Sequence, residues 1–440
     1  MLTLLCLTLA IMLLIVYKIN KVAISPAVIA LAIFWVIAAF SVLFQNYLNL
    51  TISIATYLYI VIAMIIFSIG TIFFSDYTIK KEKNKYYMDN YVFFINDNIA
   101  KIYFFVGIII LYIFILKMIG LVESVGGFNL DFSTLLHTSR DLNVNAAHDL
   151  NNTINEQLYP IWVKSFFLIN DSITYACLYG YIHNKVFEKN NQKMLLMPFV
   201  LYLLHSFLLA SRILILTMFD FIFTVYACLY LYKNGIKKLN QKIKKIICYF
   251  LPIGVLIFFM IGCFRTDGRF DLTHAIFSYG GSEIPAFDKM LNGDVVINNT
   301  NSDKIFSFYG LYYSLAQLGL YNGEIPDIIW NATYFNNQEM TNVYTAFSMY
   351  VFDFGIGGSL LLIFLLGCIL GKISGYVIKN KKDKFVLICY AILLHGVYFL
   401  PIAEELLTRM TLSLCIKLFL IYVVYRFIRN VEYDNYFSNI

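Results

Sequence analysis

Residues 51–74 read TISIATYLYIVIAMIIFSIGTIFF and contain no charged side chain. An α-helix rises about 1.5 Å per residue, so about 20 apolar residues cross the roughly 30 Å hydrocarbon core of a bilayer. This stretch is long enough to cross, and so apolar that lipid suits it better than the surface of a soluble protein. We therefore predict a membrane-spanning helix here.

The composition of the whole chain agrees with this stretch. Hydrophobic residues make up 60% of the 440 residues, and charged residues only 14%. An ordinary soluble domain is about half apolar and about a quarter charged. A soluble fold has too little interior to cover this much apolar surface, so the composition indicates an integral membrane protein rather than a soluble enzyme.

The same reasoning extends to the rest of the chain. The predicted spans are Leu2–Tyr17, Ile24–Phe44, Thr51–Phe74, Ile102–Leu121, Ile161–Ile182, Met194–Ala210, Ile213–Tyr232, Ile246–Phe264, Tyr344–Leu370, Phe385–Leu400 and Met410–Phe427. The first span lacks the basic start and the small-residue cleavage site of a signal peptide, so we expect it to be retained. The prediction is an all-α polytopic membrane protein of about 11 transmembrane helices, forming a single domain over residues 1–440.

Basic residues concentrate in alternate connections between these spans. Together 23 of the 33 Lys and Arg residues lie in 18–23, 75–101, 183–193, 233–245, 371–384 and the tail from 426 onward. Cytoplasmic loops of membrane proteins are enriched in Lys and Arg. The pattern predicts that these connections and the C-terminus are cytoplasmic and that the N-terminus is outside.

Two of the predicted outer connections are long. Residues 122–160 form the first outer loop, and residues 265–343 form a larger one that is punctuated by Gly, Asn and Asp. Long loops without structure of their own are uncommon and are often functional. We expect short helices in the larger loop, over Glu283–Leu291 and Phe306–Leu318.

Charged residues within or between apolar spans mark places where a cavity or a partner is present, because an isolated charge is costly in lipid. Arg212 lies between two apolar runs, and its guanidinium group suits a bound phosphate. Lys164 and Asp171 share one face of the fifth span and are expected to pair. Lys417, in the middle of the last span, either extends to the membrane interface or meets an internal acid.

Further charges lie where predicted spans leave the membrane. Arg265 and Arg269 are one helical turn apart, so they either clamp a diphosphate or pair with Asp267 and Asp271. In the turn after Pro401, Arg409 follows Glu405 by four residues. These two side chains either satisfy each other or contribute to a substrate site.

Motifs for cofactor chemistry do not occur in the sequence. None of the eight Cys residues forms a Cys-x-x-Cys pair, and none of the six His residues has the spacing of a metal-ligand pair. A phosphate-binding Gly loop and a nucleotide-binding fingerprint do not occur either. We expect no cofactor, no metal site and no nucleic-acid partner. His274, in the larger outer loop, is the one His considered as an acid or base.

Several stretches resemble the Wzy-type oligosaccharide repeat-unit polymerases of O-antigen and capsule synthesis. They are Tyr279-Gly280-Gly281-Ser282-Glu283-Ile284-Pro285-Ala286-Phe287, Tyr309-Gly310-Leu311-Tyr312-Tyr313 with Leu318-Gly319-Leu320, and Thr341-Asn342-Val343-Tyr344-Thr345-Ala346-Phe347 with Asp353-Phe354-Gly355 and Gly357-Gly358. The short Ser211-Arg212-Ile213-Leu214 is similar to the membrane arginine region of that family. The motifs cover about residues 200–375.

The resemblance implies a GT-C-like glycosyltransferase at the outer face of the bacterial inner membrane. Such an enzyme would transfer a growing glycan from undecaprenyl diphosphate to the next carrier-linked repeat unit. Its partners would be the undecaprenyl-diphosphate-linked glycan, membrane lipid and a chain-length regulator protein. Expected catalytic residues are Arg212, Arg265, Arg269 and Asp267, and expected substrate-binding residues are Tyr279, Glu283, Asn342, Tyr344, Asp353 and Arg409.

Boundary arginines can stabilise a diphosphate leaving group without a metal ion, and a carboxylate can accept the proton of the acceptor hydroxyl. Candidate bases are Asp267, Asp271, Glu283 and Asp353. Two alternatives remain open. One is an O-antigen ligase, which uses the same donor, and the other is a flippase or transporter of lipid-linked oligosaccharide.

Overall fold

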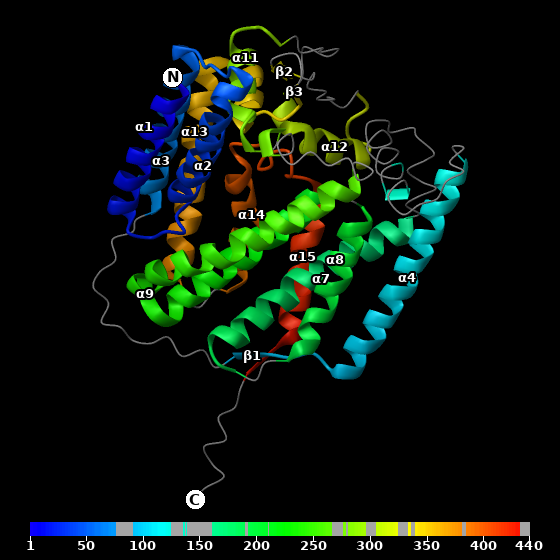
Figure 1. The fold of residues 1–440 in the computed structure, drawn as a ribbon. Helices are drawn as coiled ribbons and strands as arrows, with labels where there is room; N and C mark the ends of the chain where they lie inside the picture. The colour runs from blue at the N-terminus through cyan, green and yellow to red at the C-terminus, as the bar shows by residue number, and fades with distance from the viewer. Residues whose placement is uncertain are drawn as a thin grey trace, which may run out of the picture. The chain divides into compact units, whose positions relative to one another are not determined.

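The computed structural model describes residues 1–75, 91–124, 135–136, 138, 161–189, 192–209, 211–265, 276–278, 280–295, 305–323, 333–335, 339–380 and 384–431. Within these ranges the chain is mostly helical (Figure 1). Most of the first outer loop, 122–160, lies outside the described residues. The chain divides into two compact units. Unit 1 is Met1–Asn84 with Asp271–Cys415, and unit 2 is Lys85–Phe270 with Ile416–Ile440.

Six helices in the described part of the chain are long and apolar enough to cross a membrane. They are α1 (Leu2–Asn20), α2 (Pro26–Leu48), α3 (Ile54–Ser75), α4 (Asp97–Ser124), the Arg212–Ile243 part of α9, and α13 (Ala346–Lys379). Each coincides with a span predicted from the sequence. The chain is therefore a mostly helical, multi-pass membrane protein.

The other predicted spans are also helical, but these helices are too short or not apolar enough to count as membrane-crossing by the same length and hydropathy criteria. They correspond to α7 (Ile161–Val186), α8 (Met197–Leu208), the end of α9 (Arg212–Arg265), α14 (Lys384–Phe399) and α15 (Leu412–Ile428). At 1.5 Å per residue the 12 residues of α8 reach only about 18 Å, because the short 3₁₀ helix η1 (Lys193–Leu196) precedes it and Ser211 follows it. The connection 233–245 is mostly helical: α9 consists of two helices that meet at a break at Gly235, where φ is +78°.

Unit 1 is built around the pair formed by α3 and α13, which run side by side (Figure 1). Glycines at every fourth position of α13 face the backbone of α3. A Cβ atom on Gly367 would lie 2.6 Å from the Phe67 carbonyl oxygen, and one on Gly371 would lie 2.5 Å from that of Thr71. Only residues without a side chain allow helices to approach this closely, which is a common way for helices to associate in lipid.

The two ends of unit 1 are distinguishable by their contacts. At one end the helix N-cap Ser25 begins α2, and the Tyr390 hydroxyl of α14 contacts the Ile24 carbonyl and Ser374 of α13. At the other end lie the N-terminus, the α2–α3 turn, α11 (Glu283–Leu291), the 3₁₀ turn η2 (Phe306–Phe308), α12 (Tyr309–Gln317) and a hairpin of β2 (Thr333–Phe335) and β3 (Glu339–Thr341) (Figure 1). We call this second end the loop end. The short helices expected in the larger outer loop are therefore confirmed.

Unit 2 has one end where its basic connections meet. The strand β1 (Tyr91–Phe93) pairs with β4 (Arg429–Val431), and Asn184 after α7 bonds to the backbone of Phe93 at 3.1 and 2.8 Å. Lys233 of α9 donates to the Val186 carbonyl at 2.8 Å. We call this the basic end. Four connections predicted to share the cytoplasmic side thus share one end of this unit, which is what the alternation of basic residues requires.

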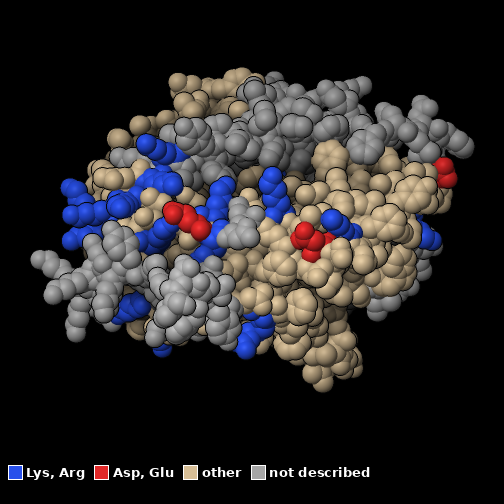
Figure 2. All heavy atoms as spheres, turned by 90° about the horizontal axis from the view of Figure 1, so that it is seen from below, with Lys and Arg blue, Asp and Glu red and all other residues tan. Residues whose placement is uncertain are grey.

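One face of the molecule carries many Lys and Arg side chains with few Asp and Glu among them (Figure 2). Clusters of basic residues next to membrane helices are favoured on the side that faces the cytoplasm and its anionic lipids.

Candidate functional site

The loop end of unit 1 gathers most of the polar residues expected to bind substrate. Helix α11 packs against α2, α3 and α13, and η2 packs against α13. The Ala346 amide at the start of α13 donates to the Leu400 carbonyl at 2.8 Å, so the segment after α14 lies at the same end. The three stretches that carry the family resemblance therefore meet in one region of the fold.

Helix α11 is fastened at both of its ends. Before it, the Ser282 hydroxyl donates to Thr341 at 3.0 Å, and the Ser41 hydroxyl of α2 donates to the Gly281 carbonyl at 2.8 Å. A Cβ atom on Gly281 would lie 3.3 Å from the Phe44 ring, so glycine permits this approach to α2. Near its C-terminal end, the Asp288 carboxylate accepts from the Ser53 amide and hydroxyl at 2.7 and 2.6 Å.

The side chain of Glu283, in the first turn of α11, is fully buried. Neither carboxyl oxygen has a hydrogen-bond partner among the described residues. Burial raises the pKa of Glu283 to about 8, because the charged form loses its hydration. The backbone N–H groups of Ser282 and Glu283 act in the opposite direction, but neither forms a hydrogen bond of normal geometry with the carboxyl group.

Asp353 has the opposite environment. Its carboxylate accepts from the Phe306 amide at 2.9 Å, the Ser307 amide at 2.7 Å and the Ser307 hydroxyl at 2.5 Å. These bonds fasten η2 to α13. Two residues later Gly355 breaks α13, with φ at +65°, a backbone conformation that favours glycine. The motif Asp353-Phe354-Gly355 is thus an anchor followed by a helix break.

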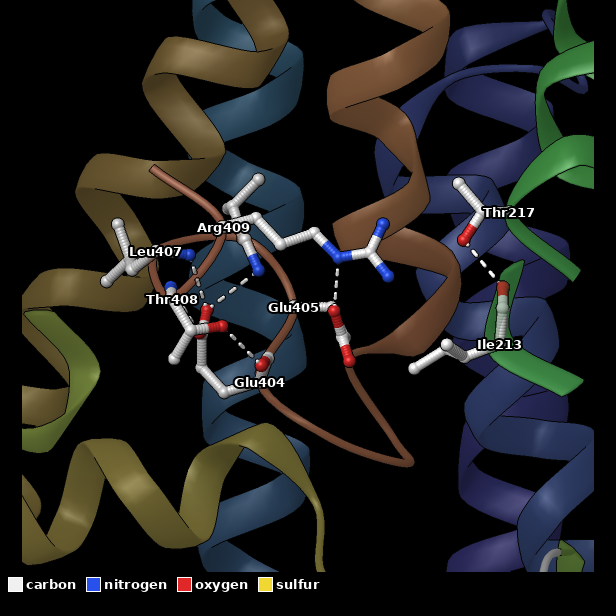
Figure 3. A network of polar contacts seen from close by, with 8 residues as sticks. Ile213, Thr217, Glu404, Glu405, Leu407, Thr408 and Arg409 are labelled. Atoms are coloured by element: carbon white, nitrogen blue, oxygen red, sulfur yellow. Dashed lines mark hydrogen bonds and ion pairs between the residues drawn. The ribbon is translucent and has the colours of Figure 1, made fainter. Parts of the chain in front are cut away.

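A second anchored carboxylate lies in the turn after α14 (Figure 3). Glu404 accepts from the backbone amides of residues 406, 407 and 408 at 3.0, 2.8 and 2.8 Å, and from the Tyr350 hydroxyl at 2.9 Å. In the same turn Arg409 forms an ion pair with Glu405. This is the self-satisfied pair that the four-residue spacing allowed, and both side chains are at most about one-third exposed, at 34% and 16%.

The two residues expected from the Asn-Val-Tyr stretch differ in accessibility. Asn342 is exposed in the turn between β3 and α13, whereas Tyr344 is 4% exposed and bonds to the Thr333 hydroxyl of β2. Lys289 of α11 donates to the Tyr334 carbonyl and lies 4.5 Å from the centre of the Phe335 ring. The hairpin is therefore held to α11 and α13, and Asn342 is accessible to a ligand.

In unit 2, Arg212 begins α9 and is 9% exposed. Because Lys233 of the same helix lies at the basic end, Arg212 is about 21 residues, or roughly 30 Å, away from that end. This distance matches the thickness of the hydrocarbon core. Arg212 thus lies on the opposite side of unit 2 from the basic connections.

The expected pair of Lys164 and Asp171 does not form. Asp171 binds Lys417 of α15 at 3.1 Å, while Lys164 is exposed. Seven residues separate the expected partners by about 10.5 Å along a helix, so a lysine from a neighbouring helix comes closer. Lys417 therefore meets an internal acid, which was one of its two expected environments.

Four of the expected site residues cannot be placed. Asp267, Arg269 and Tyr279 lie outside the described residues, as do Asp271 and His274, and the side chain of Arg265 at the end of α9 is not described either. The remaining substrate-binding candidates, Glu283, Asn342, Tyr344, Asp353 and Arg409, all belong to unit 1. Arg212 belongs to unit 2.

Two polar residues were not singled out from the sequence. The hydroxyl groups of Thr345 and Ser348, at the start of α13, are buried without a hydrogen-bond partner among the described residues. Their spacing of three places them on one face of a helix, which is the signal that could have drawn attention to them. Buried polar groups of this kind call for an explanation, because most are satisfied.

In the described part of the chain, no three His, Cys, Asp or Glu residues are grouped so that they could hold a metal ion. No protein-family model, curated protein or solved structure matches the chain. The functional assignment therefore depends on the motifs and on the geometry just described.

Proposed function

We propose that the chain is a glycosyltransferase that polymerises undecaprenyl-diphosphate-linked oligosaccharide repeat units into O-antigen or capsular polysaccharide. It would work at the outer face of the bacterial inner membrane, with about 11 spans in a GT-C-like arrangement. The N-terminus would then lie outside and the C-terminus in the cytoplasm. The glycan carrier, membrane lipid and a chain-length regulator protein would be its partners.

The observation that supports this proposal most is the meeting of the three family-like stretches at the loop end of unit 1. They are distant in sequence, yet Ser282 of the first stretch bonds to Thr341 of the third. Ser307 and Phe308, which directly precede the second stretch, contact Asp353 and Phe354 of the third. Motifs that meet in space are more informative than the same motifs scattered over a fold, because a site needs its residues together.

The physical chemistry of the reaction is compatible with this region. The donor is a lipid, so its reacting bond lies at the membrane surface rather than in the cytoplasm. The acceptor is a sugar, and the loop end carries exposed polar groups such as Asn342 beside buried acids such as Glu283. A diphosphate leaving group needs cationic donors, and the resemblance offers Arg212 for that role.

The test is a reconstitution. Purified protein in liposomes would receive one undecaprenyl-diphosphate-linked repeat unit, and the products would be separated by gel electrophoresis. A ladder of lipid-linked oligomers is the expected result. Transfer only to a lipid A core acceptor would identify a ligase, and movement of the lipid-linked sugar across the bilayer without chain growth would identify a transporter.

A further inference from the structure

The unsatisfied polar groups at the loop end form a set. Among the described residues of unit 1, Glu283, Thr345 and Ser348 bury side-chain oxygens that lack a hydrogen-bond partner, and all three are at most 2% exposed. Leaving such groups unpaired is costly, so a native fold retains them where a ligand or a water molecule completes the bonds.

Two contacts between the α11 segment and the segment that begins α13 bring Glu283, Thr345 and Ser348 to the interface of these two segments. Ser282, next to Glu283, bonds to Thr341, and Phe287, one turn further along α11, packs on Phe347 with ring centres 6.5 Å apart. The stretch of chain between these two contacts carries Thr345, and Ser348 follows directly. Glu283 therefore lies opposite the beginning of α13.

Four other described carboxylates at this end have hydrogen-bond or ion-pair partners. Asp288 is bound by Ser53, Asp353 by the η2 amides, Glu404 by three amides and Tyr350, and Glu405 by Arg409. The lone pairs of these carboxylates are therefore engaged by donors within the fold. Glu283 has no hydrogen bond of normal geometry among the described residues, so its lone pairs are not engaged in this way.

We propose that Glu283, Thr345 and Ser348 form the site for the acceptor sugar hydroxyl, and that Glu283 accepts its proton. This inference rests on the proposed polymerase function. The acceptor oxygen forms a bond to the anomeric carbon of the donor glycan, the bond from that carbon to the diphosphate oxygen breaks, and the diphosphate leaves with the electron pair. The proton of the acceptor hydroxyl passes to the Glu283 carboxylate, while the Thr345 and Ser348 hydroxyls hold the sugar.

The carboxyl group is fully buried in this structure, so the proposal requires α11 to move away from α13 before the acceptor can reach it. Several titratable groups lie near the loop end on the helices packed against α11, namely Tyr47 on α2, Tyr57 and Tyr59 on α3, and Tyr350 and Asp353 on α13. The other acids of α11 and the start of α13 have their own partners, because Ser53 binds Asp288 and Ser307 binds Asp353. Burial therefore dominates the titration of Glu283, and its pKa of about 8 places the change near neutral pH.

The pH dependence follows from the need for an ionised base. Polymerisation by the wild-type protein in liposomes should rise with pH up to about 8 and then level off. Glu283→Gln keeps the shape but cannot accept a proton. The expected result is a loss of rate of about 10²–10⁴-fold with no remaining rise near pH 8.

Variants of the Thr345 and Ser348 hydroxyl groups give a second test. Comparing their reaction rate with their thermal stability separates a role in binding from a purely structural role. Thr345→Val and Ser348→Ala should each lower the rate about three- to tenfold, while thermal stability stays the same or increases because an unpaired buried group is removed. Ser68→Ala is the matched control, since this buried α3 hydroxyl donates to the Met64 carbonyl of its own helix at 2.7 Å. Its rate should not change.

The outcomes distinguish this inference from the function on which it rests. If wild-type protein makes no polymer, the proposed function fails. If wild-type protein makes polymer and Glu283→Gln keeps both the wild-type rate and the wild-type pH profile, only the acceptor site is overturned, and the three groups surround structural water. Unchanged rates in both hydroxyl variants would likewise remove Thr345 and Ser348 from the site.

Discussion

At the scale of single residues, the carboxyl groups of unit 1 differ in how they are satisfied. Asp353 and Glu404 each accept at least three hydrogen bonds. Glu283 accepts none from the described residues. Anchoring carboxylates and reactive carboxylates need these opposite environments, because bonds that stabilise a charge also reduce its tendency to take up a proton.

The raised pKa of Glu283 has a consequence for stability. The ordinary pKa is 4.5 and the pKa in the fold is about 8, so between these pH values the folded protein binds more protons than the unfolded chain. The contribution of Glu283 to the free energy of unfolding should therefore be greatest below about pH 4.5 and fall by up to about 1.4 kcal/mol per pH unit until pH 8. Thermal unfolding in detergent, compared between wild type and Glu283→Gln, measures this contribution. Identical pH dependence in the two proteins would show that Glu283 is not buried as a neutral acid.

Arg212 provides the second prediction at this scale. Arg212→Ala should abolish polymer in cells at normal protein level, because removing one charge-stabilising donor from a water-poor site costs about 3–4 kcal/mol in the transition state. Arg212→Lys should be impaired, because Lys keeps the charge but not the paired donors. Arg426→Ala, an exposed arginine near the basic end of unit 2, is the control and should give full-length polymer. Full-length polymer from Arg212→Ala would exclude a role for Arg212 in the reaction.

At the scale of elements, the α3–α13 pair depends on glycine. Gly371 lies so close to α3 that a Cβ atom added to it would be 2.5 Å from the Thr71 carbonyl oxygen. The helices would have to separate to accept any side chain, and the neighbouring glycines at 367 and 375 would lose their contacts as well. The small residues therefore decide which face of α13 meets α3.

We expect Gly371→Ala to lower stability by about 1–3 kcal/mol, as overpacking of a close interface does. Gly120→Ala is the matched control, because nothing lies within 4 Å of a Cβ atom added on this exposed residue of α4. This control should be neutral or slightly stabilising, since Ala favours a helix more than Gly. The measurement is the melting temperature of each variant in detergent. Equal melting temperatures for the two variants would contradict the close approach of α3 and α13.

At the scale of the whole molecule, topology is the property to test. Basic residues alternate along the sequence, and four of the basic connections share one end of unit 2. With the eight native cysteines replaced, Lys185→Cys and Lys238→Cys should resist an impermeant thiol reagent in intact cells, whereas Asp294→Cys should react. All three side chains are exposed in this structure, so the membrane alone protects the first two. Labelling at position 238 with protection at position 294 would reverse the orientation.

Sequence reasoning performed well for helices and for the larger outer loop. The short helix expected over Glu283–Leu291 has those bounds, and the one expected over Phe306–Leu318 is η2 followed by α12. Both are local patterns, for which spacing and turn residues are sufficient. The pairing of Lys164 with Asp171 was wrong, because the true partner of Asp171 comes from α15, which is 246 positions away in the sequence.

The sequence by itself determined that this chain is helical and multi-pass, since uncharged stretches long enough to cross lipid leave no soluble alternative. It also determined the alternation of basic connections. Only the tertiary structure decided which acids are anchored and which is left without a partner, where α9 and α13 break, and which helices touch through glycine. Those features depend on contacts between residues far apart in the chain, and hydropathy and spacing carry no information about such contacts.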